Sequence, residues 1–191
     1  MSEATPVVVP LPPNMPQEQA ASWLEELLPD LERTGIVTDR DAVAAALLEM
    51  TRFGIPDPAL ACCALLLPEA MPVLVALFAS PGSGEAAELP GILVDNHPGD
   101  QVLNRADETV DALGVRVFQA SRVVSATEEG KSTLFLRGSL AATRRINGVD
   151  RDVCLYFTGT EVSDLATAFW PLAAFLVGDA VLQLVQLAEG T

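Results

Sequence analysis

The chain is short of basic residues and of aromatic residues, and both shortages restrict its function. Eleven Lys and Arg residues stand against 26 Asp and Glu residues among 191, so the formal net charge is −15 and the pI is about 4.2. Nucleic acids and anionic membranes attract basic surfaces, and this balance argues against either as the main partner. With aromatic residues at 5% of the chain, a core of Leu, Val and Ala is expected.

Catalytic and metal-binding motifs are missing as well. The sequence contains no G-x-S-x-G, H-E-x-x-H, P-loop or C-x-x-C pattern. His97, the single histidine, lies in a Pro-Gly turn near Asp95 and Asp100. We favour His97 as a solvated turn residue. The alternatives are that it acts as an acid–base group or that it forms a weak cation site with Asp95 and Asp100. The sequence therefore predicts a protein that is not an enzyme and has no catalytic residue, cofactor or metal.

Cysteine is scarce, and the apolar runs are short. Cys62, Cys63 and Cys154 are odd in number and lack metal-type spacing, which predicts buried, reduced thiols in a cytoplasmic protein. The first residues lack the basic and apolar regions of a secretory signal. The apolar runs at 59–79 and 165–187 are interrupted before they reach about 18 apolar residues, so no membrane span is predicted.

Half of the residues are hydrophobic, and a chain of this length suits a single domain with a real core. The proline-rich residues 1–16 are predicted to form an extended segment, in which Val7 to Val9 fit the edge of a sheet. Residues 17–191 are predicted to form one domain.

Helical spacing of apolar residues predicts two helices at the start of the domain, over 17–35 and from Thr38 to Gly54. Pro29 either kinks the first helix or begins a second short turn. Residues 60–67 and 73–78 follow, each of strand length and bounded by breakers. They are predicted to form an antiparallel hairpin, with a helix pair as the alternative.

The next segments are less regular. Residues 80–91 are predicted to be an exposed loop, and residues 92–94 a short strand. Residues 104–113 fit either a short helix or a strand.

Residues 115–157 are predicted to form an antiparallel meander. Residues 133–146 show the clearest strand alternation in the sequence, which indicates one buried face. One parity holds Leu134, Leu136, Leu140, Ala142 and Ile146, and the other holds Thr133, Arg137, Ser139, Thr143 and Arg145. Asn147-Gly148 is typical of a two-residue type I′ turn. That turn places Leu140 opposite Leu155, Ala142 opposite Val153 and Arg145 opposite Asp150. It also places Arg144 opposite Arg151 on the apolar face, which costs stability unless the hairpin tip projects beyond the core or the loop is longer.

An apolar helical segment ends the chain. Ser163 is predicted to be its N-cap, and Pro171 is expected to kink the helix or to separate two shorter ones. Such a helix must pack broadly against a sheet or a partner.

Basic residues gather in the meander. Residues 116–151 contain seven of them: Arg116, Arg122, Lys131, Arg137, Arg144, Arg145 and Arg151. Cross-strand pairing on a solvated sheet face is one interpretation. The other is a docking face for an acidic protein segment or an anionic ligand, with Arg137, Arg144, Arg145 and Arg151 as the predicted contacts.

The final strand at 153–158, its short turn and the helix at 165–176 resemble those of small actinobacterial proteins with a PsbP-like or Mog-type α/β/α fold. The acidic character, with helices on one face of a sheet, also resembles bacterial secretion chaperones. Either resemblance implies a binding or accessory protein, and neither supplies functional residues.

The sequence thus predicts an α+β fold in which a single antiparallel sheet is covered by N-terminal helices and a C-terminal helix. The leading function is a non-catalytic cytoplasmic accessory or chaperone-like protein that binds another protein, as a homodimer through an apolar sheet or helix face. The alternative is a small-molecule binding protein that holds an amphiphile or an anion in a groove between the sheet and the C-terminal helix.

Overall fold

A computed structural model describes residues 6–12, 15–52, 58–67, 70–95, 101–128 and 131–189 of the chain. Within these residues one antiparallel sheet has seven strands in the order β1-β2-β3-β7-β6-β5-β4. The strands are β1 (Val7–Leu11), β2 (Ala61–Leu66), β3 (Val73–Pro81), β4 (Gln101–Ala112), β5 (Val115–Glu128), β6 (Lys131–Ile146) and β7 (Val149–Gly159). The predicted α+β class with a single antiparallel sheet is confirmed.

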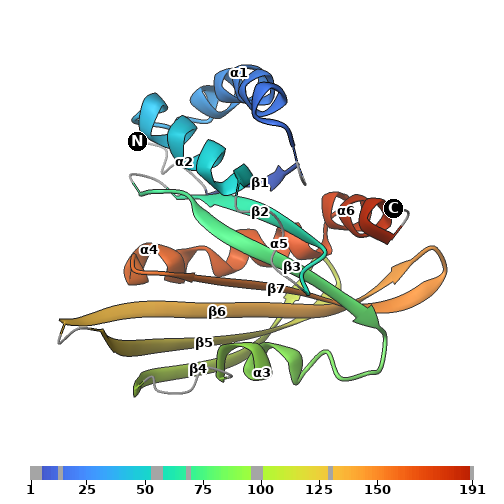
Figure 1. Ribbon diagram of the computed structural model, residues 1–191. Helices are drawn as coiled ribbons and strands as arrows, with labels where there is room; N and C mark the ends of the chain where they lie inside the picture. The colour runs from blue at the N-terminus through green and yellow to red at the C-terminus, as the bar shows by residue number, and fades with distance from the viewer. Residues whose placement is uncertain are drawn as a thin grey trace.

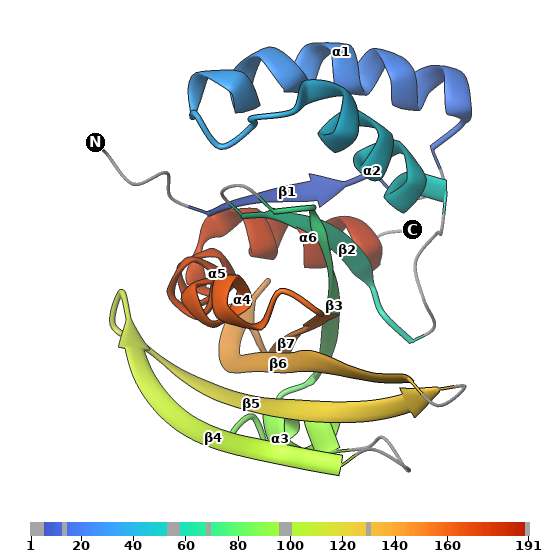
Figure 2. The same ribbon diagram turned by 90° about the vertical axis from the view of Figure 1, so that its left-hand side faces the viewer.

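The helices lie on both faces of this sheet, which curls around the C-terminal ones (Figures 1 and 2). They are α1 (Gln17–Arg33), α2 (Arg40–Arg52), α3 (Leu89–Asp95), α4 (Val162–Thr167), α5 (Phe169–Val177) and α6 (Asp179–Glu189). We call the face that packs on α4, α5 and α6 the inner face. The outer face carries α1 and α2 at the β1–β2 end and α3 at the other end.

The two N-terminal helices cover the outer face of β1 and β2. Leu24, Leu28 and Leu31 of α1 are buried, as their spacing predicts, and α1 continues through Pro29 to Arg33. In α2 the first turn is held by Asp39 rather than by Thr38, because the Ala42 backbone N–H donates to Asp39 Oδ1 at 3.0 Å.

Short apolar strands build the N-terminal end of the sheet. The predicted hairpin of β2 and β3 is confirmed, and its β2 strand is buried on both faces. Strand β1 pairs with β2 and forms one edge of the sheet. Pro10 is tolerated there because, among the described strands, none pairs with the other side of β1. Val7 to Val9 of the extended N-terminal segment therefore lie at the edge of the sheet, as predicted.

The predicted β6–β7 hairpin has the two-residue loop. Asn147 and Gly148 both have positive φ, and Leu140 lies opposite Leu155 in the observed register. Arg144 does lie opposite Arg151, on the inner face. The Arg144 guanidinium reaches out from the hairpin and donates to the backbone oxygen of Val177 at the end of α5. Burial lowers the pKa of Arg144.

Residues 92–94, predicted as a short strand, lie in helix α3, whose Val94 is buried. Helix α3 packs on the outer face of β5 and β6, with Val94 buried and Ile92 exposed, and this packing outweighs the strand propensity of the segment. Residues 104–113, which fitted either helix or strand, lie almost entirely in β4. The predicted exposed loop at 80–91 is partly anchored, because the Ser83 backbone N–H donates to the buried Asp152 at 2.9 Å.

The apolar C-terminal segment is broken twice, at Ala168 and at Gly178. Pro171 does not itself break it, because it lies in the first turn of α5, where a missing N–H costs no helical bond. The N-cap of α4 is Glu161 rather than the predicted Ser163. In the described part of the chain no single helix is long and apolar enough to cross a membrane. Helices α5 and α6 are long and apolar enough only when they are taken together, and the break between them bends the pair by 63°.

Candidate functional site

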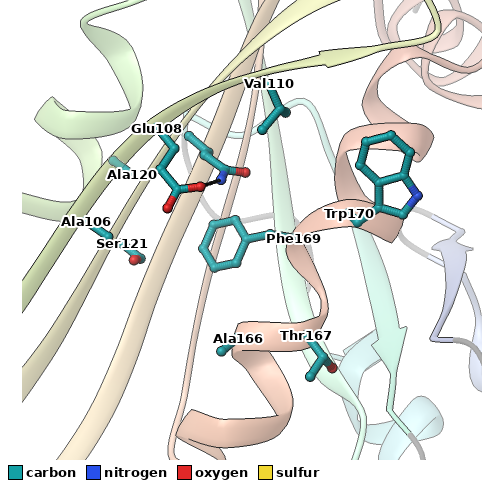
Figure 3. Close-up of a pocket in the computed structure, with 10 residues that line it drawn as sticks. Ala106, Glu108, Val110, Ala120, Ser121, Ala166, Thr167, Phe169 and Trp170 are labelled. Atoms are coloured by element: carbon teal, nitrogen blue, oxygen red, sulfur yellow. Dashed lines mark hydrogen bonds between the residues drawn. The ribbon is translucent and has the colours of Figure 1, made fainter.

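A pocket of about 370 Å³ lies between the inner face of β4 and β5 and the junction of α4 with α5 (Figure 3). It occupies the place that the sequence predicts for a groove between the sheet and the C-terminal helical segment. The lining residues are Ala106, Glu108, Val110, Gln119, Ala120, Ser121, Ala166, Thr167, Phe169 and Trp170.

The floor of the pocket is hollow because small residues meet across three strands. Ala106 of β4 pairs with Ser121 of β5, and Ser121 pairs with Gly138 of β6. In an antiparallel sheet directly opposite residues point to the same face, so this row presents little more than backbone to the helices above it. Long side chains at these positions would fill the space.

The row ends at an aromatic side chain that leans back over the glycine. Gly138 pairs with Phe157 of β7, and an added Cβ on Gly138 would lie 2.6 Å from Phe157 Cε1 and closer still to Cζ. The ring thus occupies the space that a side chain at residue 138 would need, as aromatic residues do across from strand glycines. Phe169 packs on Phe157 with ring centroids 5.5 Å apart and a tilt of 59°. Gly138 and Phe157 together support one wall of the pocket.

That wall depends on the break between α4 and α5. Ala168 is buried at the break, and the first two residues of α5 are Phe169 and Trp170. Phe169 is half-buried and points toward the strands, whereas Trp170 is 61% exposed at the rim (Figure 3). A tryptophan this exposed leaves a large flat apolar surface available to a ligand.

Polar groups are few in the pocket. Among the lining residues Glu108 is the one with a charge. The Gln119 side-chain N–H donates to Glu108 Oε2 at 2.8 Å, which holds the carboxylate against the floor. Thr167 lies at the opposite wall, where its hydroxyl donates to the backbone oxygen of Asp164 at 2.7 Å. The pocket therefore combines one oriented carboxylate with two aromatic rings and several small side chains.

A buried arginine stiffens the outer face of the same two strands. The side chain of Arg122 in β5 is 1% exposed and makes a bidentate contact with Asp95 of α3, at 2.7 and 3.0 Å. It also donates to Asp107 of β4 at 2.5 Å and to the backbone oxygen of Ser121 at 2.8 Å. Charge-assisted bidentate bonds of this kind fix geometry as well as energy.

Asp95 and Arg122 shift each other's pKa. Hydrogen bonding from Arg122 lowers the pKa of Asp95, and the charge of Arg105, 3.2 Å from Asp95, lowers it further. Hydrogen bonding to Asp95 raises the pKa of Arg122 against the opposing effect of burial. This ion-pair cluster ties α3 to the pocket strands, and a second hollow of about 460 Å³ lies beside it.

The four arginines predicted to form a docking face are divided between the two faces of the sheet. Arg144 and Arg151 are on the inner face, where Arg144 contacts the end of α5. Arg137 and Arg145 are on the outer face, half-buried and exposed respectively. The structure therefore brings Arg144 and Arg151 together, whereas Arg137 and Arg145 share a face but are eight residues apart, about 26 Å along β6.

The three cysteines are free and buried, as predicted. Burial raises the pKa of Cys63 to about 12, with a smaller effect from Cys62, and burial raises the pKa of Cys154 to about 12. His97 and Asp100 lie outside the described residues. Within the described ranges, no group of three or more His, Cys, Asp and Glu side chains could hold a metal.

The residues of the pocket were not identified individually from the sequence. Glu108 and Trp170 carry no motif, and they meet only through the register of β4 with β5 and the position of α5. A signal did exist for Arg122, which stands between Ala120 and Val124, both of them buried, on one face of β5.

Comparison with known proteins gives a weak structural likeness. No family model matches the chain, and no curated protein matches it in sequence. Among solved structures, it is similar to LpqN, which is involved in cell envelope biogenesis of Mycobacterium tuberculosis. The TM-score is 0.40 at 14% identity, over 62% of this chain and 68% of LpqN.

Proposed function

We propose that this protein is a non-catalytic binding protein for a small amphipathic molecule with a positively charged end. The pocket between β4–β5 and the α4–α5 junction is the observation that carries the proposal. The charged end of the ligand would contact Glu108, and its apolar part would lie against Phe169 and Trp170.

The chemistry of the pocket supports a cation over an anion. The one charged lining group is a carboxylate, already oriented by Gln119. A cation can also gain about 0.5–1 kcal/mol from the face of an exposed aromatic ring such as Trp170. An anion would have neither interaction, and it would approach a protein whose formal net charge is −15. Of the two ligand classes predicted from the sequence, we therefore propose the amphiphile rather than the anion.

Binding can be measured with matched probes. We would titrate hexyltrimethylammonium and hexanoate, which share a short alkyl chain and differ in the sign of the head group. The chain has two tryptophans, Trp23 and Trp170. In a Trp23→Phe variant the fluorescence reports on Trp170 alone. We expect saturable quenching or a spectral shift with the cation and little change with the anion.

Glu108→Gln is the variant that separates charge from shape. Because Glu108 is exposed, we expect it to contribute about 1 kcal/mol, so that the variant weakens cation binding about fivefold. Glu25→Gln on α1 is the matched control and should bind as the parent does. Equal affinity of the parent for both probes, or equal affinity of parent and Glu108→Gln for the cation, would contradict the proposal.

The protein-binding role predicted from the sequence is our second proposal. The exposed guanidinium of Arg145 on the outer face of the sheet, on the same strand as Arg137, favours it. Changing both residues to Glu should abolish capture of an acidic partner in a pull-down and leave amphiphile binding unchanged. A cytoplasmic location and the PsbP-like or Mog-type resemblance remain predictions of the same kind.

A further inference from the structure

Strand β4 leaves one side of the sheet open. It is the last strand in the sheet order and lies at the margin of the sheet (Figure 2). The strand is twelve residues long, and its side chains are exposed along almost its whole length. Within the described residues no strand pairs with its outer side. Long edge strands are templates for pairing with another chain unless proline, bulges or charges prevent it. The opposite edge, β1, is short and contains Pro10, whereas β4 contains no proline.

We propose that β4 pairs antiparallel with β4 of a second copy of this chain, about a two-fold axis at Ala106. The pattern of charges along the strand favours this register. Around Ala106 the side chain of Arg105 lies opposite Asp107 of the second copy, and the symmetry makes the contact twice. Asn104 likewise lies opposite Glu108 of the second copy, as an amide that can donate to a carboxylate.

Neighbouring registers bring like charges together. A two-fold axis at residue 105 places two copies of Arg105 face to face, and an axis at residue 107 or 108 does the same for Asp107 or Glu108. An axis at residue 109 places Asp107 opposite Asp111. Like charges directly opposite one another are destabilising, so these alternatives are excluded by the sequence of the strand itself.

The backbone supports the same register. In an antiparallel ladder alternate residues turn their N–H and C=O groups away from the existing partner. The β4–β5 hairpin has a two-residue turn at Leu113 and Gly114, both with positive φ, between the paired residues Ala112 and Val115. Counting back from Ala112, the outward groups are those of the odd-numbered residues. Arg105 and Asp107 therefore turn both their backbone groups and their side chains toward the second copy. The Arg105 backbone N–H donates to Asn104 Oδ1 at 2.9 Å in the single chain, and pairing would exchange this bond for one to Asp107 of the second copy.

The existing ion pairs would extend across the new seam. Arg105 already contacts Asp95 at 3.2 Å, and Asp107 already contacts Arg122. Pairing at Ala106 would give an alternating row of negative and positive groups from one copy to the other on the outer face. A bulge at Leu103 ends the regular ladder and limits the contact to the segment from 104 to 108 on each copy.

The pairing predicts a specific cross-link. In the proposed register two copies of Ala106 face each other as a pair not hydrogen-bonded to one another, with Cα atoms about 4.5 Å apart, which a disulfide can span. An Ala106→Cys variant should therefore form a covalent dimer on mild oxidation of the folded protein. The native thiols are buried and should not interfere.

Two further variants test the register. Asn104→Cys or Glu108→Cys alone should cross-link little, because each lies about 13 Å from its own copy along the strand. A mixture of these two variants should cross-link, because residues 104 and 108 face each other. If Ala106→Cys fails to cross-link, or if all single variants do so equally, the proposed pairing is wrong.

Sedimentation velocity without cross-linking provides an independent measurement. Arg105→Glu replaces the attraction to Asp107 by repulsion and should weaken dimerisation by at least about tenfold, whereas Arg52→Glu on α2 should not change it. A parent protein that is monomeric at every soluble concentration would also overturn the proposal. The pocket is formed by one chain, but its lining residues Ala106 and Glu108 also lie in the proposed seam.

Discussion

Replacing Gly138 by Ala should destabilise the protein, although alanine is ordinarily the better strand residue. The added methyl group would lie 2.6 Å from Phe157 Cε1 and closer to Cζ, so the ring must move. Overpacking of this kind costs about 1–3 kcal/mol, and relief of the glycine entropy returns about 0.5–1 kcal/mol. We expect a net loss of about 1–2 kcal/mol in the free energy of unfolding, which corresponds to a fall in Tm of roughly 3–6 °C for a chain of this size.

A double-mutant cycle shows whether the ring is the cause. In a Phe157→Leu background the atoms at Cε and Cζ are absent, so Gly138→Ala should be neutral or slightly stabilising. Urea unfolding followed by circular dichroism gives the four free energies. An equal loss in both backgrounds would refute the proposed contact between residue 138 and the ring. Because Phe157 supports Phe169, Gly138→Ala should also weaken binding of the hexyltrimethylammonium probe, while Gly91→Ala, at a position with open space, should not.

Three further predictions concern the Asp95–Arg122 ion pair and the buried thiols. The pKa of Asp95 is lowered by Arg122, so its ionised form stabilises the fold above about pH 4, and this contribution is lost as the pH falls through the lowered pKa. Asp95→Asn should thus be less stable than the parent near neutral pH and should approach it in acid, as measured by urea midpoints across that range; a constant difference would contradict the assignment. Arg122→Ala should lower the free energy of unfolding by about 2 kcal/mol. This is less than for a fully buried ion pair, because both carboxylates contact water. Arg116 is exposed, and Arg116→Ala should lower the free energy of unfolding by under about 0.5 kcal/mol. Cys63 and Cys154, each with a pKa raised to about 12, should react with a thiol reagent only when urea unfolds the chain, and fast labelling of the native protein would show that they are accessible.

The parts of the fold that were predictable from the sequence are those set by neighbours along the chain. The β6–β7 hairpin is an example, since Asn147-Gly148 sets the loop and apolar alternation sets the buried face, and together they give the observed register. The contact made by Arg144 was not predictable. Its guanidinium donates to the Val177 backbone oxygen, which requires the end of α5 to lie above the hairpin.

The candidate site shows the opposite case. Its floor comes from Ala106 and Ser121, which are ordinary small residues until β4 and β5 place them opposite each other. Helix α3 is similar, since an apolar triplet preceded by Pro90-Gly91 gives no helical period of its own and is decided by packing on the sheet. Such features need the register between distant strands, which a single sequence does not contain.

The sheet order also has a consequence for how the chain folds. Strands β4 to β7 are joined by successive hairpins, and β2 and β3 by another, but β3 and β7 pair residues seventy or more positions apart. Closing so long a loop has a large entropic cost that local hairpins do not face. We therefore expect two separately formed sheet halves to meet late, at the β3–β7 seam. Helices α4 to α6 follow β7 in the chain, so the surface that holds them is complete only once that seam has closed.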